Sequence, residues 1–111
     1  MSEGRPVRFT RSAEASLEEI AAWTLDRFGL AQAELYEAEL LERCRAIAEG
    51  RAHARDCSAL APEGRGLLYV RAGEHFLIVA EREDTVVIVE VLHSRSDLPG
   101  RIARLTDRGG R

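Results

Sequence analysis

The chain has 111 residues and a net charge of −3, from 19 acidic and 16 basic side chains, and all 16 basic residues are arginine. This length suits one domain with a single core and excludes an enzyme whose site lies between two domains. The charges separate along the chain, since residues 12–50 carry nine acidic and three basic side chains and residues 93–111 carry five arginines and two aspartates. The acidic middle argues against broad binding to nucleic acid, and the basic tail is either a solvated segment or a contact for an acidic partner.

Cysteine and histidine spacing gives no sign of a metal or redox site. Cys44 and Cys57 lack Cys-x-x-Cys spacing and are expected to be buried free thiols. The three histidines are too scattered for metal-ligand spacing, so we expect no metal and no cofactor. No apolar run approaches the roughly 20 residues that span a bilayer, and no charged-then-apolar leader opens the sequence. We therefore expect a cytoplasmic protein without a membrane partner.

The first half of the chain predicts a short strand and two helices. Residues 7–10 alternate apolar and polar side chains, as a half-buried edge strand does. Ser12 can cap a helix whose apolar residues recur at three- and four-residue steps until Gly29. A second helix begins near Leu30 and is ended by Gly50. Because almost nothing separates the two helices, they should double back as a hairpin.

The second half predicts a connecting loop and three strands. Residues 51–66 contain glycine and proline with little periodicity. Residues 67–71 and 75–81 should pair around a glycine-containing turn, and the valine-rich residues 85–92 suit a central strand. The predicted fold class is α+β, in which an N-terminal strand and a two-helix hairpin pack on a four-stranded, mostly antiparallel sheet. We expect a single domain over residues 6–108, with flexible residues 1–5 and 109–111.

The last two strands are almost continuously apolar, which predicts that both faces of the sheet are covered. The two helices can bury only one face. The other face is either left open for a protein partner or covered by the long loop and the tail. Arg101, Arg104 and Arg108 recur at helical spacing around Ile102 and Leu105, which predicts a short C-terminal helix with a basic face.

Polar side chains gather where the last strand ends, in the run from Val86 to Asp97. The strand delivers His93, Arg95 and Asp97 on a rigid support, which suggests a functional site. His93 could act as an acid or base near neutral pH, or it could form a hydrogen bond near Asp97 that fixes the exit of the strand. An exposed ion pair of Arg95 with Asp97 would contribute only about 0–1 kcal/mol, so contact with a partner explains these residues better.

The order of the elements and several short motifs resemble the ParE branch of the ParE/RelE toxin superfamily, over most of the chain. Ser96 and Ala80-Glu81 depart from residues that are common in the family. The motifs that carry the resemblance are Phe9-Thr10-Arg11-Ser12-Ala13, Phe28-Gly29 with Ala33, Pro62-Glu63-Gly64-Arg65, Arg71 with His75, and Val91-Leu92-His93-Ser94-Arg95-Ser96-Asp97.

The resemblance implies a toxin that inhibits DNA gyrase by binding it, traps it on cleaved DNA, and is silenced by a cognate ParD-like antitoxin. It implies no catalytic residue and no sequence-specific DNA binding by this chain alone. The residues expected to face the target are Arg71, His93, Arg95, Asp97 and Arg101. Those expected to face the antitoxin, on an exposed hairpin groove or sheet face, are Trp23, Tyr36, Leu40, Phe76 and Ile78, although Tyr36 and Leu40 also have the spacing of core residues.

Two alternatives stay open. RelE-like members of the superfamily cut mRNA on the ribosome with basic residues on the sheet and a C-terminal tyrosine. The corresponding positions here are Leu67, Tyr69 and His75, with Leu98-Pro99 in the region of that tyrosine. Cleavage needs proton transfer and cations beside the phosphate, and Arg95 and Arg71 are the candidate cations. The other alternative is a toxin fold that has lost toxicity and keeps only its antitoxin.

Overall fold

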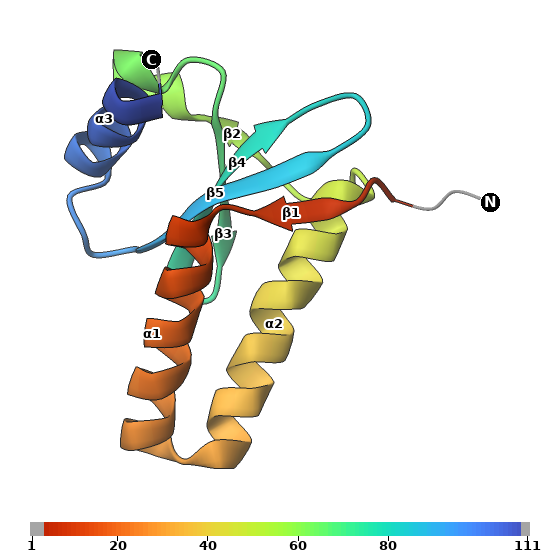
Figure 1. The fold of residues 1–111 in the computed structure, drawn as a ribbon, viewed down its shortest axis with the longest axis vertical. Helices are drawn as coiled ribbons and strands as arrows, with labels where there is room; N and C mark the ends of the chain where they lie inside the picture. The colour runs from red at the N-terminus through yellow and green to blue at the C-terminus, as the bar shows by residue number, and fades with distance from the viewer. Residues whose placement is uncertain (1–3, 110–111) are drawn as a thin grey trace.

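The elements of residues 4–109 follow the predicted order in a computed structural model, which describes only the backbone of residues 106–109. A helical hairpin projects from one side of the sheet, and α3 lies on the other side (Figure 1). The elements are β1 (Val7–Phe9), α1 (Arg11–Phe28), α2 (Leu30–Ala48), β2 (Arg55–Asp56), the 3₁₀ turns η1 (Cys57–Ala59) and η2 (Pro62–Gly64), β3 (Leu68–Ala72), β4 (His75–Glu81), β5 (Val86–His93) and α3 (Leu98–Gly109).

The sheet has five strands in the order β1-β5-β4-β3-β2. β1 runs parallel to β5, and the other neighbours are antiparallel. The α+β class and the mostly antiparallel sheet are thus confirmed. The additional strand β2 has only two residues, which pair with Tyr69 and Leu68 of β3. So short a pairing carries no periodicity, and the sequence therefore predicted a loop there.

The start of the helical hairpin differs from the prediction, while its turn does not. Thr10, rather than Ser12, caps α1, because its hydroxyl accepts a hydrogen bond from the amide of Ala13 at 3.0 Å. Gly29 ends α1 and leads directly into α2 with φ +93°, a conformation that favours glycine. Ser12 lies in the first turn of α1 and donates instead to the carboxylate of Glu90.

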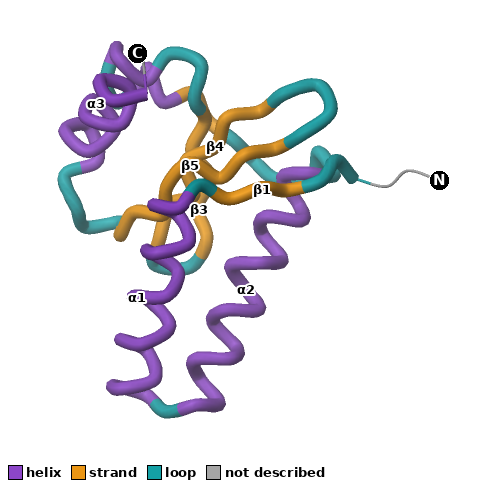
Figure 2. Tube along the Cα trace, viewed as in Figure 1, coloured by secondary structure: helices purple, strands orange, loops and turns teal. Residues whose placement is uncertain are grey.

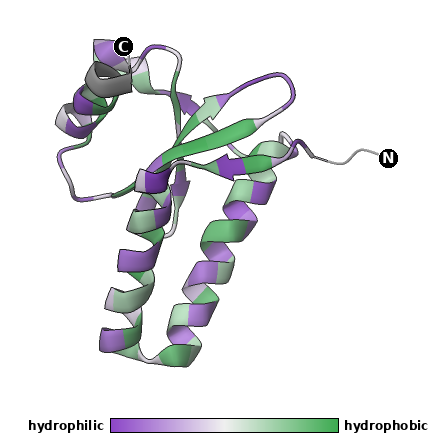
Figure 3. Cartoon of the chain, viewed as in Figure 1, coloured by the Kyte–Doolittle hydropathy of each residue, from purple (hydrophilic) through white to green (hydrophobic). Residues whose placement is uncertain are grey.

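Both faces of the sheet are covered, so the second face does not lie open. The hairpin packs on one face, where Leu40 and Ile47 join Leu77, Val79 and Ile88 in the larger core. On the other face, η1, η2 and α3 build a second core, composed of Cys57, Ala61, Ile78, Leu92 and Ile102. Of the two alternatives, cover by the loop and the tail is therefore the one that the structure shows, and the interpretation of an open face for a protein partner is wrong. Figure 2 places the strands between the hairpin and α3, and Figure 3 shows how hydrophobic β5 is between them.

A buried carboxylate fixes the start of α1 on the sheet. Glu90 of β5 is only 6% exposed. Its carboxylate accepts hydrogen bonds from the hydroxyls of Ser12 and Ser16, the latter at 2.6 Å, and from the amide of Val91 at 2.9 Å. Three donors compensate for the lost hydration, and the N-terminus of a helix favours negative charge.

Arg5 departs from the expectation that residues 1–5 are flexible. Its guanidinium donates to the carbonyls of Ile47 and Ala48 at the end of α2, and to the carbonyl of Arg82 at 2.9 Å. It also forms an ion pair with Glu81 at 2.7 Å. Arg5 therefore ties the end of the hairpin to the β4–β5 connection. The expected flexible residues 1–3 and 110–111 lie outside the described part of the chain, and Gly109 belongs to α3.

Candidate functional site

An open groove runs beside the helical hairpin, where it meets the ends of β4 and β5. Its volume is about 430 Å³. Both helices contribute apolar side chains, and the sheet contributes two histidines. We call this surface the hairpin groove, and its lining residues are Glu19, Ile20, Trp23, Thr24, Phe28, Gln32, Tyr36, Glu74, His75 and His93.

Two aromatic side chains of the groove are unusually exposed. Trp23 is 54% and Phe28 is 61% exposed, and their rings pack edge to face with centroids 5.9 Å apart. The guanidinium of Arg27 lies 4.9 Å from the centre of the Trp23 ring. Aromatic residues that remain exposed as a cluster are typical of a protein-binding surface. The hairpin groove therefore has the character of a docking site.

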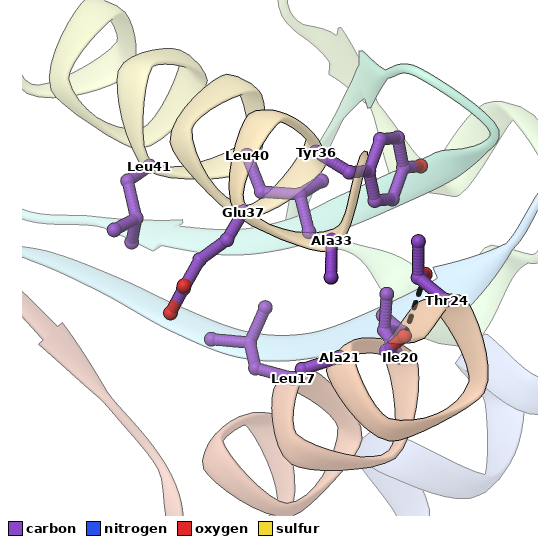
Figure 4. Close-up of a pocket in the computed structure, with 9 residues that line it drawn as sticks. All are labelled: Leu17, Ile20, Ala21, Thr24, Ala33, Tyr36, Glu37, Leu40 and Leu41. Atoms are coloured by element: carbon purple, nitrogen blue, oxygen red, sulfur yellow. Dashed lines mark hydrogen bonds between the residues drawn. The ribbon is translucent and has the colours of Figure 1, made fainter. Parts of the chain in front are cut away.

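The gap between α1 and α2 is closed, by contrast. The cavity there holds only about 30 Å³, enough for a single water. Figure 4 shows side chains of the two helices facing each other across it, including Leu17, Ala33 and Leu40. Leu40 is 2% exposed and belongs to the core. The prediction that Leu40 contacts an antitoxin is not compatible with this burial, and its competing interpretation as a core residue fits the structure.

A chain of hydrogen bonds joins the hairpin to the strand ends. The Tyr36 hydroxyl accepts a hydrogen bond from the amide of Glu74 at 2.8 Å, and it lies 2.6 Å from Nδ1 of His75 and 3.4 Å from the carbonyl oxygen of Ala72, two further hydrogen-bond partners. The rings of His75 and His93 lie edge to face, with centroids 5.0 Å apart. Nδ1 of His93 accepts a hydrogen bond from the amide of Arg95 at 3.0 Å. Both imidazoles thus form a hydrogen bond through Nδ1.

Burial sets the protonation of this network. Burial, and after it the neighbouring His93, lower the pKa of His75 from 6.5 to about 4. Burial also raises the pKa of the Tyr36 hydroxyl. His75 is therefore neutral at physiological pH. A neutral, hydrogen-bonded imidazole of this kind positions the strand ends and is poorly suited to donate a proton.

The polar run after β5 forms the turn into α3. The Ser96 hydroxyl donates to the carbonyl of His93 at 2.6 Å, and Asp97 accepts from the amide of Gly100 at 3.3 Å. His93 fixes the strand's exit through the Arg95 amide rather than through Asp97, which serves as a cap for α3. Arg95 and Arg101 are exposed on either side of this turn. His93 and Asp97 therefore stabilise the turn, whereas the side chains of Arg95 and Arg101 are available to contact a partner.

A second depression lies at the β3 edge of the sheet, between α2, the loop before β3 and side chains of β3 and β4. Its volume is about 590 Å³. The guanidinium of Arg71 donates to the carbonyl of Gly73 at 2.6 Å and lies 5.2 Å from the centre of the Phe76 ring. We call this surface the basic cleft, and its lining residues are Arg43, His53, Arg55, Leu60, Tyr69, Val70, Arg71, Gly73, Phe76 and Leu98.

The structure divides both predicted sets of site residues between these surfaces. Of the set expected to face the target, His93 lines the hairpin groove, whereas Arg71 lines the basic cleft. Of the set expected to face the antitoxin, Trp23 and Tyr36 line the groove, and Phe76 lines the cleft. Ile78 is fully buried under α3 and the loop, so its predicted contact with a partner is excluded in this conformation.

Sequence reasoning missed several lining residues. Phe28 of the groove was assigned to the core stripe because it follows the helical period, and Gln32 gave no signal. Arg43, His53 and Arg55 of the cleft come from the end of α2 and from the loop, whose distance in sequence from β3 concealed their proximity. The sequence analysis named only Arg95 and Arg71 as cations that could lie beside a phosphate. Arg43 and Arg55 are two further candidates.

The cysteines agree with the expectation for buried thiols. Cys44 and Cys57 are free and buried, and burial raises the pKa of each to about 11, so neither is a reactive thiolate at neutral pH. Residues 4–109 contain no group of three or more His, Cys, Asp or Glu side chains placed to hold a metal ion. Within the same residues, no helix has both the length and the apolar character needed to cross a membrane.

Comparison with solved structures supports the fold. The chain is similar to a toxin–antitoxin structure described as the chromosomal ParDE system from P. aeruginosa, with a TM-score of 0.66 and 14% identity over 83% of this chain and 98% of the other. It is also similar to the toxin–antitoxin complex RelBE2 from Mycobacterium tuberculosis, with a TM-score of 0.59 and 22% identity over 84% and 94% of the two chains. At these identities the likeness concerns the fold alone.

Sequence comparison identifies the family. Residues 7–98 match the model of the ParE toxin of the parDE type II toxin–antitoxin system. The chain is also 39% identical over 88 residues to Toxin ParE1 of Mycobacterium tuberculosis, in both strain CDC 1551 / Oshkosh and strain H37Rv, covering 78% of this chain and 87% of the relative. The arrangement of a helical hairpin on a mostly antiparallel sheet agrees with that match. The chain therefore belongs to the ParE toxin family of type II toxin–antitoxin systems.

Proposed function

We propose that this toxin inhibits DNA gyrase by binding it and that a cognate ParD-like antitoxin neutralises it in the cytoplasm. Membership in the ParE family supports the proposal, and the observation that carries it is the exposed aromatic groove on the hairpin. A binding protein needs such a surface, whereas an enzyme needs reacting groups in mutual contact. His75 of the groove is half-buried and neutral, and it forms a hydrogen bond with the Tyr36 hydroxyl.

The hairpin groove suits an amphipathic helix of the antitoxin. Trp23 and Phe28 project from α1, and Tyr36 lies opposite them on α2. Apolar side chains spaced at i, i+3 and i+4 on a partner helix would fill a groove of this form. Exposed aromatic anchors of this kind contribute most of the binding free energy in many protein interfaces. Trp23 and Tyr36 therefore remain in the proposed antitoxin surface, and Phe28 joins them.

The contact with gyrase is proposed at the turn between β5 and α3. Arg95 and Arg101 are exposed there, on a backbone that His93 and Asp97 hold in place. An exposed guanidinium on a fixed turn can bind a carboxylate or phosphate with two parallel hydrogen bonds. Of the predicted target residues, Arg95 and Arg101 would make the contact, and His93 and Asp97 would support it.

Cleavage of ribosome-bound mRNA is the second candidate function. The observation that favours it is the basic cleft, which places three arginines and His53 around Tyr69 and Phe76. These cations could stabilise the charge on a phosphate. The cleft has a leucine, Leu98, where the nucleases of the superfamily have their tyrosine, and this weakens the candidate.

A supercoiling assay tests the proposal. Purified toxin is added to DNA gyrase with relaxed plasmid, and both the loss of supercoiling and the accumulation of cleaved DNA are measured. We expect inhibition that the purified antitoxin reverses. A folded toxin that arrests growth but leaves gyrase unaffected would contradict the proposal. Cleavage of mRNA on purified ribosomes by that sample would then support the second candidate.

A further inference from the structure

The positive charge of the basic cleft is not neutralised by the protein itself. Arg43, Arg55 and Arg71 line the cleft, and no acidic side chain does. Among the side chains of residues 4–105, the arginines that form ion pairs are instead Arg5, Arg45 and Arg51. The Nε atom of Arg43 is also buried without a hydrogen-bond partner in the described structure. Cations gathered in a concave site without carboxylates attract an anionic ligand.

The cleft also contains an open strand edge. β2 pairs with β3 only at Tyr69 and Leu68, while β3 continues to Ala72. The amide of Cys57 donates to the carbonyl of Leu67 at 2.8 Å, so the backbone groups of Leu67 point toward the β2 side. Every second residue of a strand directs its backbone N–H and C=O to the same side. The backbone groups of Arg71 therefore also point toward the β2 side, but they lie beyond the end of β2. A backbone edge of this kind can accept another strand.

We propose that an extended acidic segment of the antitoxin binds in the basic cleft, pairs its backbone with β3 at Arg71, and places carboxylates on the guanidiniums of Arg43, Arg55 and Arg71. The inference rests on the proposed function in taking the antitoxin as the source of the segment. It adds a second contact, at the β3 edge of the sheet and separate from the hairpin groove. Strand addition of this kind obtains affinity from the backbone and specificity from alternate side chains.

The aromatic residues of the cleft favour a peptide over a nucleic acid. Tyr69 and Phe76 pack edge to face with each other, with centroids 5.5 Å apart and planes at 73°. Arg71 covers the Phe76 ring. These contacts use part of the ring surface that would otherwise stack on bases. The open edge at Arg71, by contrast, offers an amide and a carbonyl that only another backbone uses fully.

The first test uses a synthetic probe in place of the antitoxin. A fluorescent ten-residue peptide that alternates Glu with Thr would place every carboxylate on one side of an extended strand. Its binding to the full chain is measured by fluorescence anisotropy, beside a control peptide with Gln for every Glu. We expect the Glu peptide to bind about tenfold or more tightly than the Gln peptide, because charge-assisted hydrogen bonds are lost in the control. Equal binding of the two peptides, or none, would overturn the inference.

Matched variants locate the site. Arg71→Gln combined with Arg55→Gln should weaken the Glu peptide about tenfold or more, whereas Arg45→Gln removes an exposed, ion-paired arginine of α2 and should leave binding unchanged. Hydrogen exchange should show protection of the Arg71 amide by the peptide. Equal losses in both variants, or an unprotected Arg71 amide, would contradict the proposed site. If a ten-nucleotide single-stranded RNA binds more tightly than the Glu peptide, the ligand of the cleft is a nucleic acid and the inference is wrong.

Failure of this inference can be distinguished from failure of the proposed function. If gyrase is unaffected but the Glu peptide binds through Arg71, the cleft stands as an acidic-peptide site and the gyrase proposal falls. If gyrase is inhibited, and the antitoxin binds the Arg71→Gln, Arg55→Gln toxin as tightly as the unchanged toxin, the inference falls and the gyrase proposal stands.

Discussion

The hairpin groove and the basic cleft are separate surfaces, one beside the hairpin and one at the β3 edge of the sheet, and they differ in chemistry. Exposed aromatic side chains and two histidines dominate the groove, whereas arginines without a carboxylate beside them dominate the cleft. The alternation of side chains along β3 and β4 produces the difference, because Ala72 and His75 face the hairpin while Arg71 and Phe76 face the other side. A small domain can thus present two unlike binding surfaces without a second domain.

The largest expected effect separates the core under the groove from the groove itself. Leu40→Ala should lower the free energy of unfolding by about 2–5 kcal/mol, because Leu40 is fully packed between the helices and the sheet. Denaturant unfolding measures this change. Its neighbour Leu41 is 42% exposed, so Leu41→Ala should cost much less. Similar losses in the two variants would show that the hairpin is not packed as described.

A truncation on the groove should change binding while leaving stability nearly unchanged. Trp23→Ala should weaken antitoxin binding by about 2 kcal/mol, roughly 30-fold, because an exposed aromatic anchor is lost. Isothermal titration calorimetry gives the dissociation constant. Leu35→Ala is the matched control, since Leu35 is 66% exposed on α2 and does not line the groove. Equal affinities of the two variants would remove Trp23 from the antitoxin surface.

Acid should lower the free energy of unfolding through protonation of His75, which lines the hairpin groove. Its folded pKa of about 4 lies below the unfolded value of about 6.5, so below pH 6.5 the unfolded state binds more protons. The contribution of His75 is therefore complete above pH 6.5 and declines as pH falls toward 4, at no more than about 1.4 kcal/mol per pH unit and less because the ring is partly exposed. Thermal unfolding between pH 4 and 7.5 should show a shallower slope for His75→Gln. An unchanged slope in the His75→Gln variant would show that His75 does not cause the loss of stability in acid.

The smallest expected effect concerns the turn after β5. Arg95→Ala should reduce gyrase inhibition several-fold, because one exposed guanidinium is lost, while antitoxin binding stays the same. Arg82→Ala, another exposed arginine at the β4–β5 connection, serves as the control. The concentration of toxin that halves supercoiling measures the effect. Unchanged inhibition by the Arg95 variant would exclude Arg95 from the target surface.

Local patterns in the sequence were sufficient for most of the fold. The helical period, Gly29 and the glycine turn at Gly73 predicted the hairpin and the β3–β4 pair, because each depends on neighbouring residues. The continuous apolar character of β4 and β5 also predicted cover on both faces. The cap of α1 was misplaced by two residues, because Thr10 and Ser12 have equivalent hydroxyls and only contact with Glu90 distinguishes them.

The sequence by itself determined the fold class, the family and the polar turn after β5, since short-range spacing encodes all three. Tertiary structure alone decided which residues share a surface. It buried Leu40 and Ile78, separated Arg71 from His93, and brought Arg43 and Arg55 to the side of β3. The physical reason is that a binding surface is formed by residues far apart in the chain. Their proximity depends on strand order and on which face of the sheet each side chain occupies.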